Sequence, residues 1–70
     1  MRLHPDVRIA GHYGLFLVWP LTEDARQWVN QHVQLEAWQW DGDAFAVDGT
    51  AYAADLAEGM EADGLTVEVG

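Results

Sequence analysis

The stretch Tyr13-Gly-Leu-Phe-Leu-Val-Trp-Pro-Leu-Thr22 predicts the centre of the fold. It is a nearly continuous apolar run of strand length, bounded by Gly14 and Pro20 and rich in β-branched and aromatic residues. Apolar side chains occupy both of its alternating positions. Because a strand that is apolar on both faces is normally central in its sheet, we expect this run to form the core strand.

Two helices are predicted after this strand. Thr22 is a favourable N-cap for the first, and acidic residues in the next turn complement the partial positive charge of a helix N-terminus. The buried stripe expected for this helix consists of Ala25, Trp28, Val29, His32 and Val33. The second helix is expected to open at Asp48-Gly-Thr50 and to end at Gly64, a left-handed C-terminal cap. Its expected apolar stripe consists of Tyr52, Leu56, Gly59 and Met60.

Three further segments have β character. Asp41-Gly42 lies between the β-prone runs 35–40 and 43–47, which predicts a hairpin with a type I′ turn. Residues 65–69 alternate between apolar and polar side chains and predict a short final strand. Residues 1–12 are expected to be a frayed extension of the first strand, with a turn or a bulge at 11–14.

The order strand, helix, strand, strand, helix, strand predicts an α+β protein. It is the βαββαβ or split-βαβ order of ferredoxin-like folds, here in miniature, with both helices on one face of a mostly antiparallel sheet. The alternative is a three-stranded antiparallel sheet with two helices, because residues 65–69 are few. Residues 1–70 are expected to form a single domain.

If both helices cover one face of the sheet, the other face keeps apolar side chains of the core strand. Depending on register, these are Phe16 and Val18, or else Tyr13, Leu15, Leu17 and Trp19. An uncovered apolar patch usually marks a surface for a partner or for self-association.

The negative charge is concentrated in one part of the chain. The net charge of the chain is -9. Within residues 1–26 the three acidic residues are balanced by three arginines, namely Arg2, Arg8 and Arg26. Residues 27–70 contain no Lys or Arg and nine acids, namely Glu36, Asp41, Asp43, Asp48, Asp55, Glu58, Glu61, Asp63 and Glu68. Such a field repels nucleic acid and anionic membranes and attracts basic protein surfaces, although acids also keep a small Trp-rich domain in solution.

The side chains for common catalytic mechanisms are missing. The sequence has no Ser, Cys or Lys, which excludes the usual acyl-transfer nucleophiles, Schiff bases and P-loops. His4, His12 and His32 do not have the spacing of a metal site, and Asp41-Gly-Asp43 lacks the further ligands of a calcium loop. We therefore expect no enzymatic activity, no metal and no cofactor.

The acidic residues form the candidate site. Asp55, Glu58 and Glu61 recur every three residues on the predicted second helix, opposite its apolar stripe. Asp41, Asp43 and Asp48 add charge at the hairpin and before this helix. We expect these six carboxylates either to be a solvated surface or to imitate the phosphates of a nucleic acid.

The packing residues resemble those of small acidic phage and prophage proteins of unknown function. The resemblance covers residues 13–66 and consists of the segment 14–22, Ala25, Trp28, Trp40, Tyr52 and the pairs Gly59-Met60 and Gly64-Leu65. In size and acidity the chain is also similar to anti-CRISPR proteins, several of which are DNA mimics. This similarity implies a phage-encoded inhibitor of a host nucleic-acid-binding complex.

Two classes of function are therefore expected from the sequence. The first is a non-enzymatic binding protein, a monomer or weak homodimer, which blocks a basic groove of a CRISPR-type complex. The alternative is a small structural or assembly module that self-associates or docks through the uncovered apolar sheet face. No run reaches the roughly 20 apolar residues that span a bilayer, and the start lacks a signal-peptide pattern, so a cytoplasmic location is expected.

Overall fold

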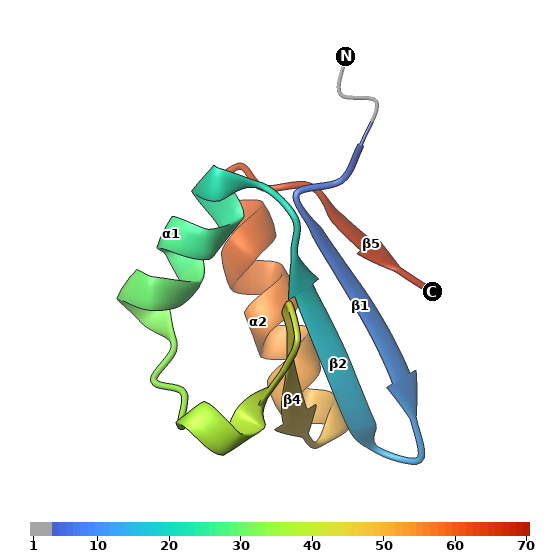
Figure 1. The fold of residues 1–70 in the computed structure, drawn as a ribbon. Coiled ribbons are helices and arrows are strands. Elements are labelled where there is room, and N and C mark those ends of the chain that lie inside the picture. Colours follow the sequence, from blue (N-terminus) through green and yellow to red (C-terminus); the bar gives the residue numbers. More distant parts are fainter. Residues whose placement is uncertain (1–3) are drawn as a thin grey trace.

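A computed structural model describes residues 4–70, which form a five-stranded sheet and two helices (Figure 1). The strands are β1 Val7–His12, β2 Leu15–Pro20, β3 Trp40–Asp41, β4 Ala44–Asp48 and β5 Val67–Val69. The helices are α1 Glu23–His32 and α2 Thr50–Ala62, and a short 3-10 helix, η1, spans Ala37–Gln39. The α+β class is confirmed.

The sheet is mixed, with the order β3-β4-β2-β1-β5. All neighbouring strands are antiparallel except β1 and β5, which are parallel. The apolar run of the sequence provides β2, the central strand, as predicted. Both the four-stranded sheet and its three-stranded alternative are wrong, because residues 7–12 contribute a strand that was not expected.

This additional strand, β1, pairs with β2 along its whole length, from Val7 with Pro20 to His12 with Leu15. Residues 7–12 are thus a separate strand and not a frayed extension of the core strand; residues 1–3 of that prediction lie outside the described part. The two-residue turn consists of Tyr13 and Gly14, with φ of 54° and 82°. Positive φ at both positions is the type I′ pattern that matches the twist of a hairpin.

The second hairpin is present but its turn differs from the prediction. Asp41 pairs with Ala44, so the turn residues are Gly42 and Asp43. Gly42 has φ of 63°, whereas Asp43 does not have a positive φ, so the predicted type I′ turn is wrong. The register follows the Trp40–Phe45 pair, whose rings meet edge to face with centroids 5.4 Å apart.

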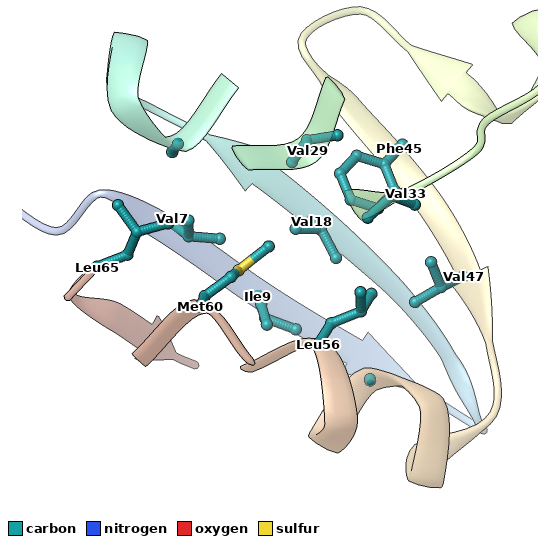
Figure 2. Close-up of a cluster of buried hydrophobic side chains, with 12 residues drawn as sticks. Val7, Ile9, Val18, Val29, Val33, Phe45, Val47, Leu56, Met60 and Leu65 are labelled. Atoms are coloured by element: carbon teal, nitrogen blue, oxygen red, sulfur yellow. The ribbon is translucent and has the colours of Figure 1, made fainter. Parts of the chain in front are cut away.

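The predicted helix ends are confirmed. The backbone N–H of Ala25 donates to Thr22 Oγ1 at 3.2 Å, which makes Thr22 the N-cap of α1. Gly64, with φ of 91°, follows α2, and the N–H of Leu65 donates to the carbonyl of Met60 at 3.0 Å. This is the left-handed Schellman ending, and it brings the buried Leu65 and Met60 side chains together (Figure 2).

Two members of the predicted stripes are exposed. His32 is exposed at the end of α1, and Tyr52 is 46% exposed on α2. The buried residues of α2 are Ala53, Leu56 and Met60. The stripe of α2 is therefore shifted by one residue at its start, from Tyr52 to Ala53.

The core lies between the two helices and one face of the sheet. Figure 2 shows Val18, Phe45 and Ile9 of the strands pointing toward Val29 of α1 and Leu56 of α2. Because strand side chains alternate between faces, Leu15, Leu17 and Trp19 of β2 lie on the opposite face. No described helix covers that face.

Candidate functional site

Three candidate acids lie on one side of α2. Asp55, Glu58 and Glu61 are all exposed, and the buried residues of the helix face the sheet on its other side. Three residues of helix rise about 4.5 Å, so the three carboxylates form a row along the helix axis. Within residues 4–70 none of the three side chains makes a hydrogen bond or ion pair.

The described arginines leave this row unneutralised. Arg26 contacts Glu23 at 3.6 Å within α1, and Arg8 is exposed on β1. Because residues 27–70 contain no Lys or Arg, the field around the outer side of α2 is set by carboxylates.

The other three candidate acids are placed elsewhere. Asp41 and Asp43 flank Gly42 at the β3 edge of the sheet, whereas Asp48 lies at the opposite end of β4. All three are exposed. Asp48 also has a structural explanation, since it precedes the N-terminus of α2, where negative charge is stabilising. The six predicted residues therefore do not form one surface, and the row on α2 is the part that the fold brings together.

A polar cleft between the ends of α1 and α2 was missed by sequence reasoning. Trp28 Nε1 donates to Asp63 Oδ2 at 2.6 Å, and the His32 ring stacks on Trp28 with centroids 4.4 Å apart. His32 Nε2 lies 3.8 Å from the same Asp63 oxygen. The cleft has a volume of about 320 Å³.

This cleft has a structural role that its contacts explain. Trp28 joins α1 to the C-terminal end of α2 through Asp63, and its ring lies against Gly59, where a Cβ atom would be 3.1 Å from Cζ2. Residues 4–70 contain no group of three His, Cys, Asp or Glu side chains placed to hold a metal ion. The signal in the sequence was the pair Trp28 and Gly59, a large and a small residue on helices expected to be neighbours.

The open sheet face is the second candidate surface. Leu15 is 53% exposed, Leu21 is 45% exposed, and Leu17 and Trp19 are half-buried. The sequence left two registers open, and the correct one places Leu15, Leu17 and Trp19 on the face away from the helices. Tyr13, which was grouped with them, lies in the turn between β1 and β2. Two shallow depressions on this face have volumes of about 300 and 260 Å³.

Among residues 4–70, neither helix is long and apolar enough to cross a membrane. Comparison with protein-family models, with curated proteins and with solved structures finds no significant match.

Proposed function

We propose that the protein is a non-enzymatic binding protein whose α2 carboxylates engage a basic surface of a nucleic-acid-binding protein. The observation that carries this proposal is the row of Asp55, Glu58 and Glu61, which is exposed, unpaired among the described residues and remote in sequence from any Lys or Arg. Asp41, Asp43 and Asp48 extend the negative field at the two ends of β4.

The mechanism is imitation of a phosphate backbone. Duplex DNA carries one charge per about 1.7 Å of its axis, and proteins bind it with clustered Lys and Arg side chains. A helix with a carboxylate at every third residue offers such a cluster a row of anions on a rigid support. The bound protein blocks access to the groove without any chemical reaction. Because several ion pairs act together near the surface, binding weakens as salt is added.

The partner class proposed is a host complex that binds nucleic acid, of which CRISPR-type complexes are one kind. The small size and the acidity of the protein support this choice. The protein then acts in the cytoplasm of the host cell and binds as a monomer or a weak homodimer.

Two charge-reversal variants test this proposal, because they change the net charge equally. D55K/E58K/E61K reverses the row on α2, and D41K/D43K/D48K reverses the acids at the ends of β4. We expect the first to abolish capture of basic partners from a host lysate at low salt and the second to reduce it only several-fold. Circular dichroism confirms that both fold, since exposed sites tolerate substitution.

Two results would contradict the proposal. One is capture that is equally strong at low salt and at about 0.5 M salt, where charges on the surface are screened within about 4 Å. The other is equal loss of binding in both variants, which would show a response to net charge alone.

A second candidate function is assembly through the open sheet face. Leu15, Leu17 and Trp19 form an apolar surface that no described element covers. Association there is driven by burial of apolar side chains and tolerates salt. Sedimentation of the protein and of L17E across a range of salt concentrations tests it: a dimer that persists at high salt and is lost in L17E is expected, and a monomer throughout excludes it.

We also propose that the fold is a split-βαβ arrangement, as in ferredoxin-like proteins, to which β1 is added. Two strand-helix-strand units support this. Helix α1 connects β2 to β3, and β4 lies between these two strands in the sheet. Helix α2 connects β4 to β5, and β2 and β1 lie between those two strands.

A further inference from the structure

An apolar groove lies between α2 and the β5 side of the sheet. Its volume is about 320 Å³, and its lining is almost wholly apolar. The sheet contributes Ile9, Phe16 and Val69 to the lining, and α2 contributes Thr50, Ala53, Ala54, Ala57 and Glu58.

Small side chains on the helix create this groove. Leu56 and Met60 fill the space between α2 and the sheet on the core side, whereas the side of α2 that faces the groove carries alanines. Phe16 forms part of the floor because its ring lies directly over Gly11, where a Cβ atom would be 2.1 Å from the ring. Val69 is 72% exposed, so the groove opens to solvent beside β5.

The edge of β5 beside the groove suits an extended chain. The carbonyl of Thr66 and the N–H of Gly70 both bond to the β1 side. Because backbone groups alternate along a strand, those of Val67 and Val69 face the free edge. An extended segment added there places alternate side chains toward the groove, as in recognition by strand addition.

The charge around the groove defines the chemistry of its occupant. Glu58 is part of the lining, and Glu61 and Asp55 lie one turn away on either side of it. A second copy of this chain, with a net charge of -9, is repelled by this rim. A chain that carries Lys or Arg beside an apolar residue complements it.

We propose that the groove receives an apolar side chain from an extended, basic segment of a partner protein, while the neighbouring Lys or Arg side chains pair with Glu58 and its neighbours. The inference rests on the proposed function and deepens it, since it adds a buried apolar anchor to the charged contacts. Interfaces commonly combine such an anchor with a polar rim.

Two lysine pentapeptides of equal charge, each acetylated only at its N-terminus, serve as probes. One has leucine and the other has alanine at the central position. Binding to the ¹⁵N-labelled protein at low salt is measured by NMR titration. Burial of a leucine side chain raises affinity by about ten- to hundredfold, so the leucine peptide is expected to bind at least about tenfold more tightly. The largest shifts are expected at Ala53, Ala54, Ala57 and Val69.

Matched variants locate the anchor. A54L fills the groove from the helix side and is expected to abolish the preference for the leucine peptide, whereas A51L makes the same change at an exposed position of α2 outside the groove and is expected to leave it. V69T, at an exposed position of the sheet side, is expected to lower the preference as well and provides a second variant should A54L perturb folding.

The outcomes separate this inference from the proposed function. Equal affinity for the two peptides, or a leucine preference that A54L and V69T leave unchanged, overturns the groove inference only. Binding of the alanine peptide that is insensitive to salt and to D55K/E58K/E61K overturns the proposed function. A dimer in sedimentation that A54L dissociates shows that a second copy occupies the groove, which also overturns the inference.

Discussion

At the scale of single residues, Asp6 is the most constrained polar group of the described chain. It is fully buried, accepts a hydrogen bond from Thr22 Oγ1 at 2.8 Å through one oxygen, and accepts one from the Thr66 N–H at 2.8 Å through the other. One carboxylate thus joins the start of β1 to the cap of α1 and to the entry of β5. Nothing in the sequence around Asp6 indicates this role, because both partners are distant along the chain.

The replacement Asp6→Ala is expected to lower the free energy of unfolding by about 3 kcal/mol. It leaves the Thr66 N–H and the Thr22 hydroxyl without their acceptor, and a buried polar group that loses its partner costs about 1–3 kcal/mol. Urea unfolding measures the loss. Glu58→Ala, at an exposed carboxylate, is the control and is expected to change stability by less than about 0.5 kcal/mol. Similar losses in both variants would contradict the role assigned to Asp6.

At the scale of elements, local signals were readable in the sequence and non-local ones were not. The Thr22 and Gly64 caps act on backbone groups a few residues away, so the local sequence is enough to locate them. A turn or a bulge was expected at residues 11–14, and the turn is present, but its position at Tyr13-Gly14 was not predicted because a tyrosine rarely adopts positive φ. The register of the second hairpin depends on a ring contact between Trp40 and Phe45, which no local pattern specifies.

The β1–β2 turn gives a prediction at this scale. Tyr13→Asn produces the Asn-Gly pair that type I′ turns favour, since asparagine tolerates a φ of 54° better than tyrosine does. The variant is expected to be more stable by about 0.5–1 kcal/mol in urea unfolding. The turn residue Asp43, whose φ is not positive, is the control, and Asp43→Asn should have little effect. A Tyr13→Asn variant less stable than the parent protein would show that φ is not what limits this turn.

At the scale of the whole molecule, the sequence indicates the amount of negative charge, and the fold determines which acidic residues lie close together on the surface. The helical period alone placed Asp55, Glu58 and Glu61 on the exposed side of α2. Their separation from Asp41 and Asp43 depends on strand order, and the groove beside Glu58 depends on how α2 lies on β1 and β5. Neither feature follows from residue spacing, because both arise from contacts between distant segments.

The excess of carboxylates is expected to make stability depend on salt. Like charges repel one another in the compact state, and added salt screens this repulsion. Raising NaCl from about 0.02 M to about 0.5 M should therefore increase the melting temperature by a few degrees. The variant D55N/E58Q/E61Q should melt higher at low salt and respond less. A melting temperature that falls with salt in the parent protein would show that attractive pairs dominate.

The parallel pairing of β1 with β5 has a mechanical consequence. It joins segments 60 residues apart, through Asp6 and Thr66 at one end and Ile9 and Gly70 at the other. Figure 1 shows the two strands side by side, so that the start of β1 and the end of β5 lie at opposite ends of the pair. A pulling force on those ends loads all these bonds at once, in shear, instead of opening them one after another. Separation of β1 from β5 by such a force therefore requires these bonds to break together.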